Sequence, residues 1–244
     1  MKPLQCPAHQ RGFTLVEIAI VLVIIGLLLG GVLKGQEMIT QARIKNVMND
    51  LNGVSSAYFA YQDRYKQIPG DDNQAGGTTG RWPTLGMPAT SNGTLGDGKI
   101  QGQFDSATAG DESVLFWWDL RAAGFIPGAT TGTAAYTQPT NALSGKIGAT
   151  TDVPGTSDAG LAGVIVCSQH LPDKIIGAVD TQMDDGNPNT GTLRGLAETT
   201  ITAGGITITA QIPTTGGLPA SFAASTATNY PETGTGSYTA CRQI

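Results

Sequence analysis

The sequence predicts an α+β fold in which one long N-terminal helix packs on a head that contains an antiparallel β-sheet and short helices. An apolar run near the N-terminus continues into a helical pattern that no proline interrupts before Pro69. The rest of the chain is rich in Gly and Thr, with 34 glycines in 244 residues. Charged residues make up 14%, against ~25% in ordinary soluble domains. This composition favours a turn-rich, strand-containing exported domain over a cytosolic enzyme.

The apolar run Phe13–Leu33 is long enough to be transmembrane. Its 21 residues include a single charge, Glu17. At about 1.5 Å per residue the helix spans about 31 Å, enough to cross the hydrocarbon core of a bilayer. A secretory signal peptide has a shorter apolar core followed by a small-residue cleavage site, whereas Lys34 follows here. Lys2 and Arg11 precede the run, so the positive-inside rule keeps the N-terminus in the cytoplasm.

An ordinary signal-anchor helix fits these facts but does not explain Glu17, since a charge in an apolar span costs about 2.5–3.5 kcal/mol. The segment Gly12-Phe13-Thr14-Leu15-Val16-Glu17 resembles the processing site of type IV prepilins and type II secretion pseudopilins. The resemblance implies that a prepilin peptidase cuts between Gly12 and Phe13 and methylates the new N-terminal Phe13. It also implies that Glu17 pairs with the N-terminal amine of a neighbouring subunit during assembly. Such an amine, with a pKa of about 7.7–8, is largely protonated, and the pair offsets two desolvation costs.

The helical pattern extends well beyond the apolar run. Apolar residues recur at steps of three and four over the next turns, at Ile44, Val47, Met48, Leu51, Val54, Tyr58 and Tyr65. Pro69-Gly70 ends the pattern, which predicts one helix of about 56 residues. Such a helix, transmembrane in its first half and packed under a head in its second, is the pilin-like architecture that the resemblance implies.

Glycines replace a feature that many pilins share. In that family a helix-weakening proline often stands about two-thirds along the apolar run, where this chain has Gly26, Gly30, Gly31 and Gly35. Glycines also weaken a helix and allow close contact between helices. The choice between a pilus subunit and a secretion pseudopilin therefore stays open.

We expect three parts: a cleaved leader at 1–12, the transmembrane and filament-core half of the helix at 13–40, and a periplasmic or extracellular head at 41–244. The chain would start as a single-pass inner-membrane protein with a cytoplasmic N-terminus and end in a periplasmic or cell-surface filament. The implied partners are the prepilin peptidase, identical or related pilin subunits, an inner-membrane assembly platform and, before assembly, membrane lipid. The formal net charge is −5 and no basic cluster occurs, so no nucleic-acid partner is predicted.

Cleavage would remove Cys6 and leave Cys167 and Cys241. Two cysteines in an exported domain favour one disulfide, here closing a loop of about 75 residues. In the chain-entropy model such a bond is worth up to about 4 kcal/mol. Two free buried thiols are the alternative. Pilins of the resembled family often tie the end of the chain to the sheet in this way.

The head can be predicted only coarsely. Residues 71–110 form a long loop with a small hairpin at Asp97-Gly98. A short helix over 112–123 follows Asp111 as N-cap and ends at Gly124. We expect Trp118 on its buried side and Trp117 more exposed. The other predicted elements are a strand at 163–168, a helix with Pro172 as its first residue, and a hairpin over 201–210 around Gly204-Gly205.

An acidic cluster is the better of two candidate metal sites. Asp180, Asp184 and Asp185 gather at the C-terminal end of the second short helix, where the helix dipole is already negative. Asn187 and Asn189 add oxygen ligands, and oxygen ligands suit Ca²⁺. The segment 167–191 also resembles a pattern in some prepilin-type proteins, and major pseudopilins bind calcium in their heads. A solvated helix end balanced by Lys174 or Arg194 is the alternative, and we expect no required cofactor. Asp71-Asp72 is a weaker candidate that favours a turn.

Catalysis is not expected. The mature chain would keep one histidine, His170, which we expect in a loop, and neither a G-x-S-x-G elbow nor a P-loop occurs. Two function classes remain. One is a structural subunit of a type IV pilus or type II secretion pseudopilus. The other is a minor, tip-located subunit whose head binds a surface, a substrate or DNA, which the mature length of 232 residues (244 − 12) slightly favours.

Overall fold

The computed structural model describes residues 14–77, 79–85, 91–151, 161–198, 201–203, 206–208, 229–230 and 236–244. By its internal contacts the chain divides into two units, Met1–Ala42 and Arg43–Ile244, which are described in turn.

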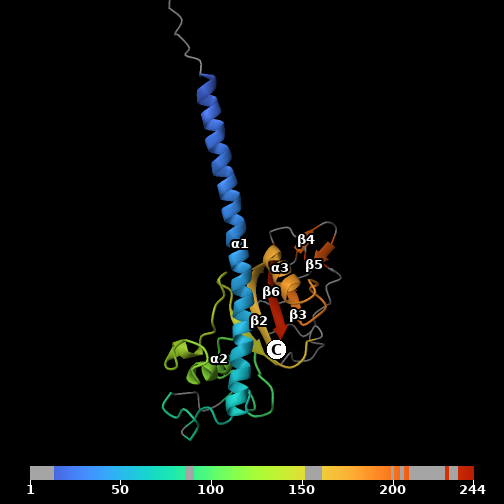
Figure 1. Cartoon of the computed structure of the whole chain (residues 1–244). Helices are drawn as coiled ribbons and strands as arrows, with labels where there is room; N and C mark the ends of the chain where they lie inside the picture. The colour runs from blue at the N-terminus through green and yellow to red at the C-terminus, as the bar shows by residue number, and fades with distance from the viewer. Residues whose placement is uncertain are drawn as a thin grey trace, which may run out of the picture. The chain divides into compact units, whose positions relative to one another are not determined.

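A single helix, α1, runs over Leu15–Tyr65 and contributes to both units (Figure 1). It confirms the predicted long helix and is shorter than predicted by a few residues at the C-terminal end, where Lys66 takes a positive φ of 56°. Among the described residues, α1 is the one helix long and apolar enough to cross a membrane. Its large apolar side chains from Leu15 to Ile39 are exposed.

Within the second unit, α1 buries one stripe of side chains against the head. The buried residues repeat at steps of three and four: Ile44, Val47, Leu51, Val54, Ala57, Tyr58 and Tyr61. Met48 and Tyr65, which belong to the predicted stripe, are partly buried against the same core. The packing of this stripe confirms the amphipathic pattern.

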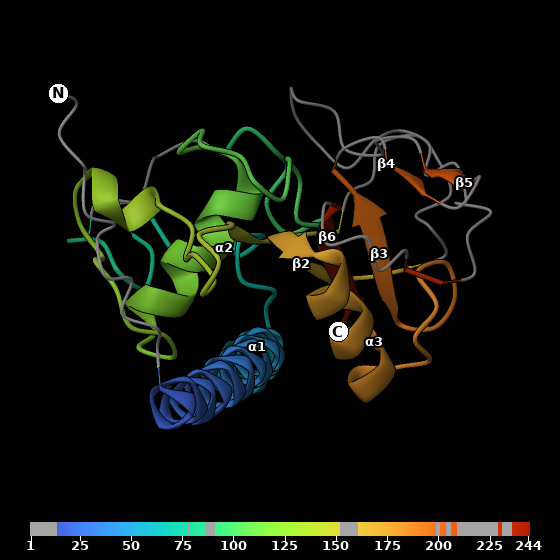
Figure 2. The same ribbon diagram turned by 90° about the horizontal axis from the view of Figure 1, so that it is seen from above.

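The head contains a four-stranded antiparallel sheet in the order β1-β2-β6-β3. The strands are β1 Ile147–Thr150, β2 Ile165–Pro172, β3 Leu193–Ala197 and β6 Ser237–Gln243. One face packs on α1 and α3 in the main core, which holds Val166, Leu193 and Ala240. Figure 2 shows α1 and α3 on the same side of the sheet. The opposite face carries a smaller cluster with Phe104, Leu161, Cys167 and Cys241.

Helix α2, Glu112–Ala122, is buried on every side, which corrects the expectation for Trp117. Trp117 is 1% exposed because it packs in the main core with Phe116 and Leu120. Trp118 faces the other way, in a cluster with Ala75 and Ala135. The helix thus lies between two clusters, and neither tryptophan reaches the surface. Gly124 follows it with a φ of 79°, as expected for a helix end.

The remaining elements follow the predictions with small shifts. Helix α3 covers Asp173–Met183, with Pro172 one place earlier than expected, at the N-cap. Strands β4 Ile201–Ala203 and β5 Ile206–Ile208 pair antiparallel, which confirms the hairpin. A 3-10 helix, η1, spans Thr133–Tyr136. The hairpin expected at Asp97-Gly98 is wrong, since no strand lies in residues 91–110.

Candidate functional site

Glu17 lies in the first turn of α1, in a reciprocal contact with Thr14. The Thr14 amide and hydroxyl each donate to Glu17 Oε2 at 2.8 Å. The Glu17 amide donates in return to Thr14 Oγ1 at 3.3 Å. This is a capping box, which fixes the first turn of a helix by satisfying orphan amides. Gly12 and Phe13, the predicted processing residues, lie outside the described residues.

The capping box leaves the Glu17 carboxylate available to a further partner. Among the described residues its hydrogen bonds come from Thr14, and the side chain is exposed. The apolar side chains that follow are exposed as well, and an unbroken apolar surface of this size needs lipid or protein around it. An ion pair between Lys34 and Glu37 at 2.7 Å marks the end of the apolar run.

The predicted disulfide is confirmed. Cys167 of β2 and Cys241 of β6 are bonded and stand directly opposite each other in the register. Both are buried, at 0% and 1% exposure. The bond therefore belongs to the interior of the sheet and joins its two central strands.

The structure brings the three predicted acidic residues together, with one carboxylate oxygen of each within 4.8 Å of the others. Asp180 is buried in α3, where its Oδ2 accepts the Tyr230 hydroxyl at 2.6 Å and its Oδ1 accepts the Gly186 amide at 3.1 Å. Burial raises the pKa of Asp180 to about 6, although both hydrogen bonds act in the opposite direction.

The other two carboxylates organise the loop between α3 and β3. Asp184 Oδ2 accepts the amides of Thr192 at 2.6 Å and Leu193 at 2.9 Å. Asp185 accepts the Thr190 hydroxyl and the Asn187 amide, and these bonds lower its pKa.

The acidic cluster has the oxygen atoms expected of a calcium site. Its carboxylates also have a structural role that needs no ion. Clustered carboxylate oxygens are the ligands that Ca²⁺ prefers. The same oxygens already accept hydrogen bonds that shape the loop, and the charge of Arg194 also lowers the pKa of Asp185. Asn187, expected as a ligand, turns its side-chain oxygen to the Asn189 amide at 3.1 Å. Calcium binding stays a prediction.

Asp71 and Asp72, the weaker candidate pair, are both buried and anchor loops instead. Asp71 accepts three consecutive backbone amides, those of Gly96, Asp97 and Gly98. Asp72 accepts the Tyr61 hydroxyl at 2.6 Å. The Asp97-Gly98 turn thus folds around a carboxylate from a distant part of the chain.

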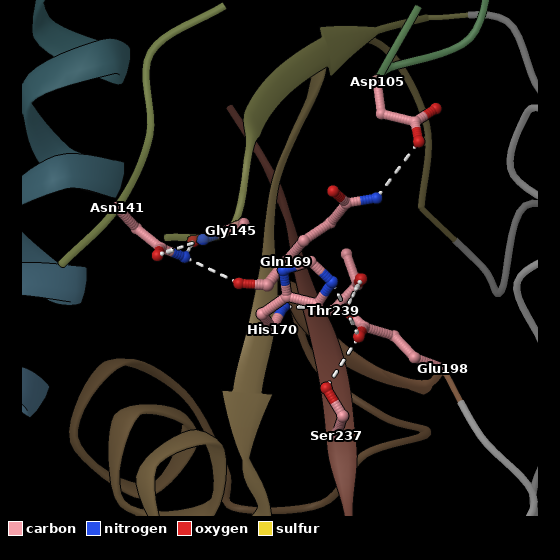
Figure 3. Close-up of polar contacts among 9 residues, drawn as sticks. Asp105, Asn141, Gly145, Gln169, His170, Glu198, Ser237 and Thr239 are labelled. Atoms are coloured by element: carbon pink, nitrogen blue, oxygen red, sulfur yellow. Dashed lines mark hydrogen bonds and ion pairs between the residues drawn. The ribbon is translucent and has the colours of Figure 1, made fainter. Parts of the chain in front are cut away.

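A polar cluster that sequence reasoning missed surrounds Glu198, at the end of β3 (Figure 3). Glu198 accepts the His170 amide at 2.7 Å and the hydroxyls of Ser237 at 2.7 Å and Thr239 at 2.8 Å. The His170 ring lies 3.7 Å from the same carboxylate. His170 is in the irregular part of β2, with a φ of 59°, so its expected place in a loop is wrong. No spacing in the sequence links these residues, because they meet only through strand pairing.

The Glu198 cluster is not arranged as a catalytic triad of serine, histidine and acid. The Ser237 hydroxyl donates to Glu198 rather than to the imidazole. A hydrolytic triad needs the base to contact the nucleophile. The contacts instead hold the irregular part of β2 against β3 and β6.

Comparison with known proteins identifies one feature of the chain. Residues 7–33 match the family described as the prokaryotic N-terminal methylation motif. No curated protein and no solved structure matches the chain. The matched residues contain Gly12, Phe13 and Glu17 and the whole apolar run, and the motif is that of structural subunits rather than enzymes. The chain therefore carries the prepilin-type cleavage and methylation signature, on an α+β fold of pilin-like arrangement.

Proposed function

We propose that this chain is a structural subunit of a type IV pilus or a type II secretion pseudopilus. In this proposal prepilin peptidase removes residues 1–12, Phe13 becomes the methylated N-terminus, and α1 carries the subunit into a filament. The observation that carries the proposal is the match of the methylation motif to residues 7–33. It is supported by the exposed apolar side chains that follow on the same helix.

The apolar half of α1 would serve two environments in turn. Residues 13–40 would first lie in the inner membrane, with the N-terminus in the cytoplasm, and later among the α1 helices of other subunits. Both environments remove the same apolar surface from water, so transfer between them needs no refolding of the helix. Glu17 would be neutralised in the filament by the N-terminal amine of a neighbouring subunit.

The decisive experiment is to express the full chain together with prepilin peptidase and to determine its mature N-terminus. Mass spectrometry should show a mature chain that begins at Phe13 with one added methyl group. Gly12→Val should leave the leader attached, because the peptidase requires the small residue before the bond. Gly35→Ala is the matched control, since a Cβ at this half-buried position meets nothing within 4 Å. Retention of Met1 in the wild-type chain would contradict the proposal.

Filament location then separates a shaft subunit from a tip subunit. Cells that express the assembly platform are sheared, and the released filaments are quantified against whole cells. A dominant band identifies a shaft subunit. A trace amount confined to filament ends identifies the binding module that the long head would suit.

A further inference from the structure

The turn that follows α1 is fixed to α2 by one buried carboxyl group. Asp119 of α2 is 0% exposed, and its Oδ2 accepts the Gly70 amide at 2.6 Å. Its Oδ1 is buried and has no hydrogen-bond partner within the part of the chain that the structure describes. A buried carboxylate with an unsatisfied oxygen is costly, whereas a neutral carboxylic acid in the same place is much less so.

Gly70 lies so close to the backbone of α2 that no residue with a Cβ fits in its place. Its φ is 88°, and a Cβ there would lie 2.5 Å from the Glu112 carbonyl oxygen and 3.0 Å from the Phe116 amide nitrogen. The backbone of the turn therefore rests directly on the backbone of α2. We define the strap as residues 66–77 and 79–82, which follow α1 in the chain and include this turn.

The strap has a second attachment, at the end of α1. Asp72 accepts the Tyr61 hydroxyl and forms an ion pair with Arg81, whose guanidinium lies 4.7 Å from the Tyr65 ring centre. Trp82 packs edge-on against Trp118 of α2 at 5.8 Å. These contacts hold the strap across α1 and α2.

The charged and titratable groups around Asp119 come from three elements. Tyr61 comes from α1, and Asp72 and Arg81 come from the strap. Arg121 of α2 itself donates to the carbonyls of Ala135 and Thr137. Arg81, the one of these cations that acts on Asp119, is already paired with Asp72.

Complete burial raises the pKa of Asp119 to about 8, although the Gly70 amide and the Arg81 charge both act to lower it. Near neutral pH the folded protein therefore keeps a proton on this carboxyl group. Loss of that proton would leave a buried negative charge, and Arg81, the cation that acts on it, is already paired with Asp72. Opening of the strap would expose this charge to water and so remove the cost of burying it.

We propose that Asp119 is a proton-operated latch: as a neutral acid it holds the strap on α2, and with loss of its proton the strap opens. In the open form the carboxylate meets water and titrates near its ordinary value, about 3.9. The opening equilibrium therefore increases about tenfold for each pH unit between about 4 and 8 and levels off above that. The device couples the surrounding pH to the attachment of the strap across α1 and α2.

Hydrogen exchange of the full chain in detergent micelles tests the latch. Peptides that contain Gly70 are followed by mass spectrometry from pH 5 to 9, with rates corrected for intrinsic exchange. Wild-type protection should fall about tenfold per pH unit and level off near pH 8. Asp119→Asn, which cannot ionise, should give a flat profile. Asp63→Asn is the matched control, because Asp63 is 88% exposed and pairs only with Lys66 in the described residues, and it should follow the wild type.

Three results would overturn the latch. They are a flat wild-type profile, a sloping profile in Asp119→Asn, and protection of the Gly70 peptides equal to that of α3 peptides at every pH, which would show that the strap opens only when the whole head unfolds. If Asp119→Asn does not fold, the comparison of strap and α3 peptides in the wild type still decides the question.

Discussion

Cys167 and Cys241 occupy directly opposite positions on β2 and β6, although 74 residues separate them in the chain. Strand pairing already brings the two residues together in the folded state. The disulfide therefore acts mainly on the unfolded chain, by restricting a long loop.

Cys167→Ser/Cys241→Ser should fold to the same sheet with lower stability. The chain-entropy model sets the loss at up to about 4 kcal/mol. Urea unfolding of the full chain in detergent measures it, and the reduced wild type should match the double variant. Two freely alkylated thiols in peptide maps of the unreduced exported protein would contradict the bond itself.

Glu17→Ala should be processed normally but should assemble poorly. Cleavage depends on the residues at the cut, whereas assembly in the proposed function needs a carboxylate to neutralise the neighbouring amine. The mature N-terminus and the yield of sheared filaments are the two measurements. Glu37→Ala is the matched control, since its carboxylate is exposed and pairs with Lys34 on the same helix. Normal filament yield from Glu17→Ala would remove the argument for the pair.

If the acidic cluster binds calcium, the protein should melt at a higher temperature with Ca²⁺ than with a chelator. A hundredfold excess over the Kd stabilises the folded state by about 2.7 kcal/mol. For a head of about 200 residues, each kcal/mol of added stability raises the melting temperature by roughly 2–4 °C. Asp184→Ala should abolish the increment and Asp63→Ala should keep it. Without any shift at millimolar Ca²⁺, the carboxylates serve only to shape the loop.

The stability of the wild type should fall as the pH rises from 6 to 8. The pKa of Asp119 is raised on folding, so the folded state holds its proton more tightly than the unfolded chain does. The contribution to stability is therefore complete below about pH 4 and is lost as the pH rises to about 8. Asp180, with a pKa of about 6, contributes in the same direction at lower pH, which is why the window starts at 6. Urea midpoints at pH 6, 7 and 8 should shift less in Asp119→Asn than in the wild type.

Local patterns predicted the parts of the molecule that depend on local chemistry. The apolar periodicity located α1, and the motif around Gly12 and Glu17 pointed to processing. Cysteine count and export together predicted the disulfide. Each of these depends on residues close in sequence or on a pairing with few alternatives.

Features that depend on distant segments could not be predicted in this way. The burial of Trp117 and Trp118 on opposite sides of α2 requires two separate clusters around one short helix. The place of His170 depends on Glu198, which reaches it through β6. Asp97-Gly98 reads as a hairpin in isolation, but a remote carboxylate, Asp71, binds its amides. In each case a tertiary contact overrides a sound local expectation.

The central position of β6 has a consequence for export. β6 is the last of the described strands in the chain, yet it pairs with both β2 and β3. Until β6 is present, β3 has no neighbour among the described strands of the sheet and Cys167 has no disulfide partner. If the head is exported, as the proposed function requires, it cannot complete this sheet until its C-terminal strand has also crossed the membrane. A chain truncated before Ser237 would then present unpaired strand edges, which are open to proteolysis and aggregation.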